Sequence, residues 1–145
     1  IISTVPGVPC VYQGDEYGVP GANDPDNRDM MTFECENDYQ VREFEQTKAL
    51  FHARRESMPL NYGDLRTLYV DDQAWVFLRH YMGDWTIVAL NVRTDVKTIE
   101  VELPAFAKCG NLETAVATEG ADVRCLGDGK LEVTLPAYGY IIANK

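Results

Sequence analysis

The chain of 145 residues is long enough to bury a hydrophobic core of its own. Its 23 acidic and 13 basic residues give a formal net charge of -10, which argues against a nucleic-acid partner, because phosphates require a basic face. No apolar run is long enough to cross a bilayer, so we expect no membrane contact, and the charge says nothing about an uncharged partner.

The chain begins with a short apolar run that leads into a polar loop. Residues 9–13 predict a strand, which is apolar at Cys10, Val11 and Tyr12 and is closed by Gly14. Short runs of this kind are typical of a parallel strand that is buried on both faces. A buried strand that delivers a polar loop at its C-terminal end is how α/β barrels place substrate-binding groups.

The opening stretch IISTVPGVPC lacks the basic region and the long apolar run of a signal peptide, and it looks like the middle of a domain. A leader on a longer parent protein stays open. The localisation is therefore left open between the cytoplasm and the periplasm or the exterior.

Residues 39–57 predict a helix, with Asp38 as its N-cap and Pro59 just beyond its end. Arg54 and Arg55 fall in the last turn, where positive charge complements the helix dipole. The apolar residues that recur at helical spacing are Val41, Phe44 and Phe51.

After the helix the pattern changes to alternation of apolar and polar residues. Ile99 and Val101 alternate with polar neighbours, and Asp128-Gly129 between two apolar runs indicates a hairpin. Many short strands separated by regular turns predict an antiparallel sandwich. The expected strands are residues 65–70, 74–81, 85–92, 98–103, 112–116, 123–126, 130–135 and 138–143.

The predicted fold class is therefore mainly β: an antiparallel β-sandwich preceded by a strand, a loop and a helix. We expect two parts, residues 1–62 and residues 63–145.

The cysteine and histidine pattern favours no metal site. The sequence has no Cys-x-x-Cys pair, and its two histidines, His52 and His80, lie far apart, so zinc is disfavoured and no cofactor is predicted. Cys109 and Cys125 could pair within the sandwich, but free buried thiols are the favoured interpretation. The four cysteines are Cys10, Cys35, Cys109 and Cys125.

The acidic residues of the loop at 23–29 suggest a candidate calcium site. Asp24, Asp26 and Asp29 lie close in sequence, but they lack the glycine and the final glutamate of a helix–loop–helix calcium site. Solvated loop acids are therefore favoured.

Three stretches of the chain carry a family resemblance. They are PGVPCVYQGDEYG at residues 6–18, NDPDNR at 23–28 and ALFHARRESMPLNYGDL at 49–65. In this order they resemble the end of the catalytic barrel in the α-amylase family of glycoside hydrolases, and the Asp-Pro-Asp-x-Arg loop resembles its neopullulanase and cyclomaltodextrinase-like branch. The resemblance implies that residues 1–62 are the remnant of a (β/α)8 barrel and that residues 63–145 are the sandwich called domain C.

The resemblance also implies a substrate contact at Asp24 and Arg28. These residues match the family loop whose aspartate and arginine hydrogen-bond a glucose unit, a role that suits a carboxylate acceptor and a forked guanidinium donor. The alternative is an ion pair that only holds the loop. For this chain by itself that alternative is favoured, because the rest of the cleft is not in the sequence.

Asp15 and Glu16 are adjacent acids, which suggests the carboxyl pair of a retaining glycosidase. The family takes its catalytic acids from earlier barrel strands. We therefore expect Asp15 and Glu16 to brace the loop, and we expect no catalytic residue in this chain.

The resemblance implies the C-terminal part of a retaining enzyme that hydrolyses or transfers α-glucosidic linkages in malto-oligosaccharides. Two alternatives stay open: a free-standing carbohydrate-binding sandwich and a purely structural accessory domain. The binding alternative would use strand aromatics, for which packing is the default: Trp75, Trp85, Tyr81, Tyr138 and Tyr140. Because the first strand and the helix would leave apolar surface uncovered, a homo-oligomer through residues 1–60 is also predicted.

Overall fold

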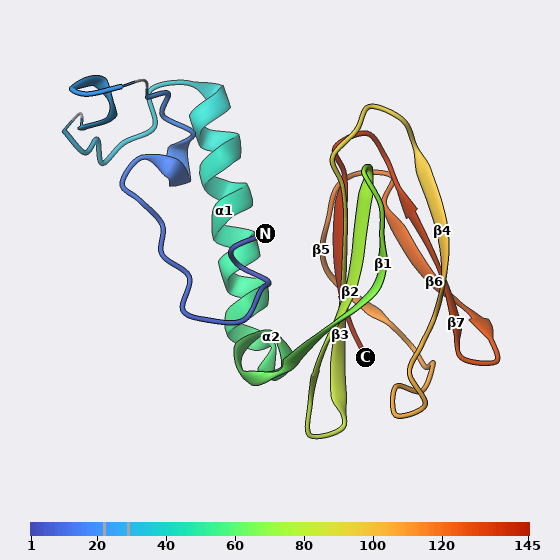
Figure 1. The fold of residues 1–145 in the computed structure, drawn as a ribbon. Helices are drawn as coiled ribbons and strands as arrows, with labels where there is room; N and C mark the ends of the chain where they lie inside the picture. The colour runs from blue at the N-terminus through green and yellow to red at the C-terminus, as the bar shows by residue number, and fades with distance from the viewer. Residues whose placement is uncertain (22, 29) are drawn as a thin grey trace.

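The computed structural model describes residues 1–21, 23–28 and 30–145. Two β-sheets stack face to face, and a long helix with the N-terminal segment beside it lies on the outer side of the larger sheet (Figure 1). The predicted class, a mainly antiparallel β-sandwich preceded by a helix, is confirmed. The predicted division at residues 62 and 63 stays a prediction.

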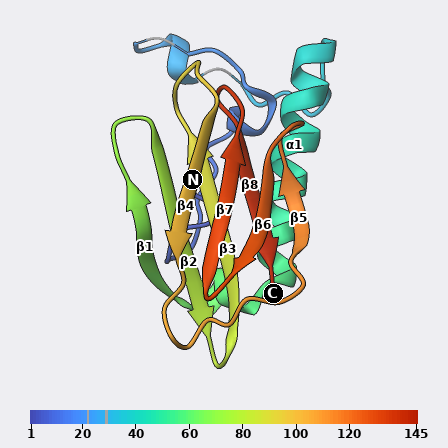
Figure 2. The same cartoon turned by 90° about the vertical axis from the view of Figure 1, so that its right-hand side faces the viewer.

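In the part of the chain that the structure describes, all eight strands predicted for the sandwich are present, with ends shifted by at most two residues. The five-stranded sheet has the order β1-β2-β3-β8-β5 and the three-stranded sheet the order β4-β7-β6, with antiparallel pairing throughout (Figure 2). The strands are β1 (Asp64–Val70), β2 (Ala74–Tyr81), β3 (Asp84–Asn91), β4 (Lys97–Glu102), β5 (Glu113–Ala117), β6 (Asp122–Gly127), β7 (Lys130–Leu135) and β8 (Tyr140–Asn144).

The core lies between the two sheets, where alternation turns one side of each strand inward. Ile99 and Val101 of β4 are buried, as predicted. They pack with Val133 of β7 and with Val76 and Ile87 of the larger sheet in one apolar cluster. Such burial is the dominant stabilising term in a sandwich of this size.

The predicted Asp-Gly hairpin joins β6 to β7. Asp128 and Gly129 both have left-handed backbone angles, with φ values of 48 and 74 degrees. Two consecutive left-handed residues match the twist of the flanking strands, which is why Asp-Gly is favoured there.

Helix α1 (Asp38–Glu56) confirms the predicted helix but not its cap. The N-cap is Asn37, whose side chain accepts a hydrogen bond from the Gln40 N–H at 3.0 Å. Asn37 has the extended backbone that an N-cap requires, whereas Asp38 is already helical.

Pro59 lies beyond the end of α1, as predicted, but the chain does not leave helical structure there. A second helix, α2 (Met58–Tyr62), follows, and Pro59 lies in its first turn. Ser57 ends α1 and caps α2, and its hydroxyl accepts from the Leu60 N–H at 3.3 Å. Proline is tolerated in the first turn because its missing N–H would have no helical partner there.

The two helices pack on the outer face of the larger sheet. Leu60 of α2 is fully buried against Phe77, Val88 and Ile142, and Leu50 of α1 packs beside them. The helices therefore share a second, smaller core with the sandwich.

The predicted strand at residues 9–13 is wrong. These residues form no strand; Val8 is 96% exposed, and Cys10 is exposed as well. A strand buried on both faces needs a neighbour on each side, and the described residues supply neither. Two short turns follow instead, η1 (Asp15–Tyr17) and η2 (Asp26–Arg28).

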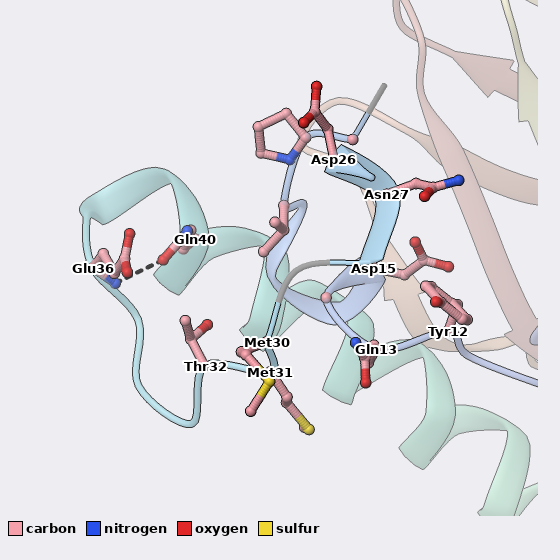
Figure 3. Close-up of a pocket in the computed structure, with 14 residues that line it drawn as sticks. Tyr12, Gln13, Asp15, Asp26, Asn27, Met30, Met31, Thr32, Glu36 and Gln40 are labelled. Carbon is pink, nitrogen blue, oxygen red and sulfur yellow. Dashed lines mark hydrogen bonds between the residues drawn. The ribbon is translucent and has the colours of Figure 1, made fainter. Parts of the chain in front are cut away.

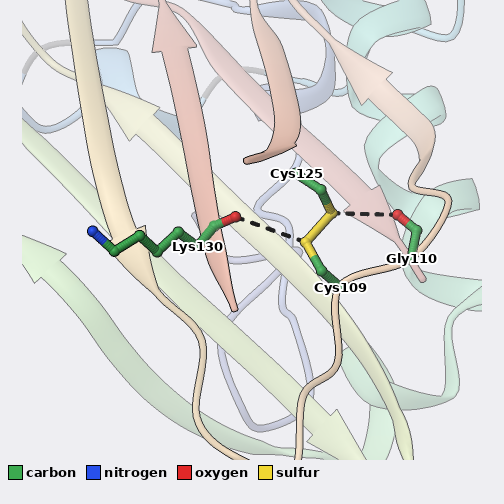
Figure 4. The surroundings of a disulfide bond; sticks show 4 residues. All are labelled: Cys109, Gly110, Cys125 and Lys130. Atoms are coloured by element: carbon green, nitrogen blue, oxygen red, sulfur yellow. Dashed lines mark hydrogen bonds between the residues drawn. A yellow bond between two sulfur atoms is a disulfide. The ribbon is translucent and has the colours of Figure 1, made fainter. Parts of the chain in front are cut away.

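The interpretation of Cys109 and Cys125 as free thiols is also wrong. The two form a disulfide, with their Cα atoms 6.0 Å apart, and it fastens the loop after β4 to strand β6 (Figure 4). Their sulfur atoms contact the carbonyl oxygens of Lys130 and Gly110. Cys10 and Cys35 are free.

Exposed apolar side chains are concentrated at the start of the chain. They include Ile1, Ile2, Val8, Val11, Tyr12, Val19, Met30, Met31, Phe33, Tyr39 and Val41. The homo-oligomer through residues 1–60 stays a prediction that this distribution supports. Among the described residues, no helix has the length and hydropathy needed to cross a membrane.

A charge on the inner face of β4 should destabilise the sandwich. Val101→Asp is expected to lower the free energy of unfolding by about 3–5 kcal/mol, because it buries an unpaired carboxylate. Thr98→Asp is the control, since Thr98 is exposed on the same strand. Urea denaturation measures both, and an unchanged midpoint for Val101→Asp would show that the inward face is wrongly assigned.

The disulfide should be present in protein purified without reductant. Thiol titration of the denatured, unreduced chain should then find two reactive cysteines, Cys10 and Cys35. Reduction should lower stability by about 3 kcal/mol, the order expected for a loop of this length. Four reactive thiols before reduction would contradict the pairing.

Candidate functional site

A cavity of about 400 Å³ lies between the loop that follows the N-terminal segment and the first turn of α1 (Figure 3). Its described lining includes the carboxyl groups of Asp15, Asp26 and Glu36 and no lysine, arginine or histidine. An anionic ligand is therefore disfavoured. Amide and hydroxyl groups beside apolar side chains suit a neutral polar ligand.

Asp24 and Arg28, the two predicted substrate-binding residues, lie together on the outer side of this loop. The Arg28 guanidinium donates to the Asp24 carboxylate at 2.6 Å. The Arg28 side chain is 70% exposed and that of Asp24 60%. Neither residue lines the cavity. The pair is accessible to a ligand from solvent, and it also holds its own turn closed.

Asp15 and Glu16 are placed in the short turn η1. The Glu16 carboxylate accepts from the Gly14 N–H at 2.9 Å, so this acid is used inside the loop. The next residue, Tyr17, stacks on Phe44 of α1 with ring centroids 5.2 Å apart. The turn is thus braced against the helix, in agreement with a structural role for Glu16.

Two of the strand aromatics are used in packing. Trp85 is 1% exposed within the core between the sheets. Trp75 is partly buried on the outer face of the larger sheet, and its indole N–H donates to Thr67 at 3.0 Å. Trp85 has no accessible face for a sugar, and Trp75 packs against Phe77 with ring centroids 4.4 Å apart.

The tyrosines do not form a sugar-stacking platform. Tyr81 meets Tyr62 at a tilt of 45 degrees, and the Tyr140 hydroxyl accepts from Gln46 of α1. Tyr138 is exposed by itself, at the turn before β8. An exposed coplanar pair, which a free-standing carbohydrate-binding sandwich would require, is not seen among the described residues.

The part of the chain that the structure describes contains no group of three or more histidine, cysteine or acidic side chains able to hold a metal. Of the three acids considered for calcium, Asp29 lies outside the described residues. His52 lies exposed on α1 beside Arg55, and His80 packs against Phe106.

The sequence analysis missed the two arginines that hold the N-terminal segment. Arg54 of α1 and Arg79 of β2 are 6% and 0% exposed, and both donate to the backbone of residues 3–7. Arg54 was noticed only for its charge at the end of a helix. No sequence signal marked Arg79, because alternation alone would have predicted an apolar residue at a buried position.

Comparison with protein-family models finds no match. Curated relatives do match nearly the whole chain. Neopullulanase 2 of Thermoactinomyces vulgaris is 33% identical over 141 residues, which are 95% of this chain and 23% of the relative. A cyclomaltodextrinase of Geobacillus thermopakistaniensis is 31% identical over 145 residues, 96% of this chain and 23% of the relative. The chain thus spans about a quarter of the length of these relatives.

Solved structures likewise match nearly the whole chain. A debranching enzyme from Nostoc punctiforme has a TM-score of 0.82 and 28% identity, and it covers 99% of this chain and 29% of its own. An α-amylase from Geobacillus thermoleovorans, in complex with acarbose, has a TM-score of 0.80 and 25% identity over 99% of this chain and 31% of its own.

Proposed function

We propose that this chain, which belongs to the α-amylase family and matches the C-terminal part of its members, is part of a retaining glycoside hydrolase that acts on α-glucans. The carrying observation is the match along nearly the entire chain to a neopullulanase and a cyclomaltodextrinase, together with the fold shared with a debranching enzyme and an α-amylase. The whole enzyme would hydrolyse or transfer α-glucosidic linkages in malto-oligosaccharides.

In this enzyme Asp24 and Arg28 would contact a glucose unit of the substrate. Their exposure supports this role, as does their position on a loop that is braced to α1 through Tyr17. A carboxylate accepts from sugar hydroxyls and a guanidinium donates to them, so the present ion pair can exchange part of its bonding for a sugar at small cost.

The catalytic carboxylates would come from outside residues 1–145. The engagement of Glu16 with the Gly14 N–H supports a structural role for this acid. The sandwich would serve as an accessory domain, whose larger sheet covers one side of α1 and α2. The free-standing binding module that the sequence left open is disfavoured by the packed tryptophans.

Replacing either member of the pair should weaken substrate use by the full-length enzyme that carries this chain. Asp24→Ala and Arg28→Ala are each expected to lower kcat/KM for maltohexaose about 10–100-fold, the order for a lost charged hydrogen bond, mostly through KM. Arg124→Ala is the matched control, because Arg124 forms an exposed ion pair on the sandwich with Glu132. Unchanged kcat/KM in both variants, at unchanged melting temperature, would refute the assigned contact.

The 145-residue chain by itself should not turn over substrate. Incubation with maltotriose or with a chromogenic α-glucoside is expected to release no product above the buffer rate, since the proposed enzyme takes its acids from elsewhere. Turnover that follows the protein through successive purification steps would contradict this expectation.

A further inference from the structure

The N-terminal segment is held by a set of contacts that we call the carbonyl clasp: the guanidinium groups of Arg54 and Arg79 with the carbonyl oxygens of Ser3, Thr4, Val5, Gly7 and Gly63. Arg54 donates to Ser3 at 3.0 Å, to Val5 at 3.1 Å and to Gly7 at 2.6 Å. Arg79 donates twice to Gly63, at 3.2 and 2.7 Å, and once to Thr4.

The two arginines of the clasp are buried, and no carboxylate forms part of it. Ser3 and Thr4 are 2% and 3% exposed, and among the described residues neither Arg54 nor Arg79 forms an ion pair. Burial lowers the pKa of Arg79, and the positive charge of Arg54 lowers it further, while Asp64 opposes both effects. Two neighbouring buried cations need negative charge beside them. Here the partial negative charges of the backbone carbonyl oxygens meet that need.

The geometry around Gly63 leaves little freedom. A Cβ atom at this position would lie 2.5 Å from the Pro59 carbonyl oxygen and 2.6 Å from that of His80, so only glycine fits. The Gly63 carbonyl is thereby fixed between α2 and β2, where both Arg79 bonds reach it. The clasp is built on rigid elements on every side except the N-terminal segment.

The segment leads directly to the loop with Asp24 and Arg28. Residues 8–13 are not in regular structure, and Tyr17, a few residues further along, stacks on Phe44 of α1. The start of the loop is thus attached to α1 through this stack, and it is attached to the sandwich through the clasp, to which the sandwich contributes Arg79.

We propose that Arg79 and Arg54 are positioning residues for the loop that carries Asp24 and Arg28. Both arginines hold residues 3–7. Because Arg79 belongs to β2, the position at which the loop begins depends on the larger sheet of the sandwich. The sandwich then contributes to substrate binding without touching substrate. The consequence for substrate, although not the positioning itself, rests on the proposed function of the loop.

Hydrogen exchange on the whole chain tests the positioning. In Arg79→Lys an ammonium cannot reach Thr4 and Gly63 together as the planar fork does. Exchange of the Thr4 and Val5 amides, which bond to the Ile1 carbonyl, and of residues 8–21 should rise about tenfold or more, while β3 and β8 change less than about twofold. Arg66→Lys is the matched control, because Arg66 is exposed on the adjacent strand β1.

Two results would overturn the positioning role: exchange of residues 1–21 at the wild-type rate, or an equal rise in every strand. If Arg79→Lys does not fold, Arg54→Lys decides by the same criteria, since Arg54 lies on the helix outside the sandwich core.

Kinetics of the full-length enzyme separate this inference from the proposed function. Arg79→Lys should raise KM for maltohexaose several-fold with little change in kcat, and it should add nothing to Asp24→Ala in the double variant. Full additivity would mean that Arg79 does not act through the loop. If Asp24→Ala alone has no effect while exchange still rises in Arg79→Lys, the clasp positions the loop but the loop does not bind substrate.

Discussion

A buried guanidinium carries a positive charge and five N–H donors that need partners, and Arg79 makes its three hydrogen bonds to backbone carbonyls rather than to an acid. Its partners, Gly63 and Thr4, belong to parts of the chain that no sheet or helix would otherwise join. Arg54 adds three more carbonyls from the same segment. The sandwich, helix α1 and the N-terminal segment thereby meet at the clasp, and the position of residues 3–7 depends on it.

Under the proposed function, this connection would give the sandwich an indirect part in substrate binding, through the position of the loop. The cavity and the exposed Asp24–Arg28 pair both belong to the loop that starts a few residues after the clasp. The loop is anchored to α1 on one side and, through the clasp, to β2 on the other. If the loop binds substrate as proposed, holding it in place before binding would reduce the entropy lost when a sugar binds.

The features predicted correctly are set by the order of residues within one segment. The features that were missed depend on which distant segments of the chain lie next to each other. Alternation located β4 and β7, because a half-buried strand needs period two, and Asp128-Gly129 located their neighbouring hairpin, because both residues tolerate left-handed backbone. The strand at residues 9–13 failed because apolar pattern cannot reveal whether neighbours exist. The interpretation of Cys109 and Cys125 as free thiols was wrong because spacing in sequence does not give the distance between a loop and a strand. Asp24 and Arg28 are candidates because they match a motif, and their substrate contact stays a prediction. Arg79 matches no motif and becomes visible only from its burial and its partners.

The central claim is that two buried arginines hold the N-terminal segment through its backbone. Proton-detected NMR of the arginine side chains tests it most directly, because a buried, hydrogen-bonded guanidinium exchanges slowly with water and rotates slowly about its bonds. The account predicts persistent side-chain N–H signals from Arg54 and Arg79 at neutral pH, with cross-relaxation to the α-protons of residues 3–7, and rapidly exchanging signals from the exposed Arg66. Rapid exchange of the Arg79 signals in the folded chain, without contacts to residues 3–7, would contradict it.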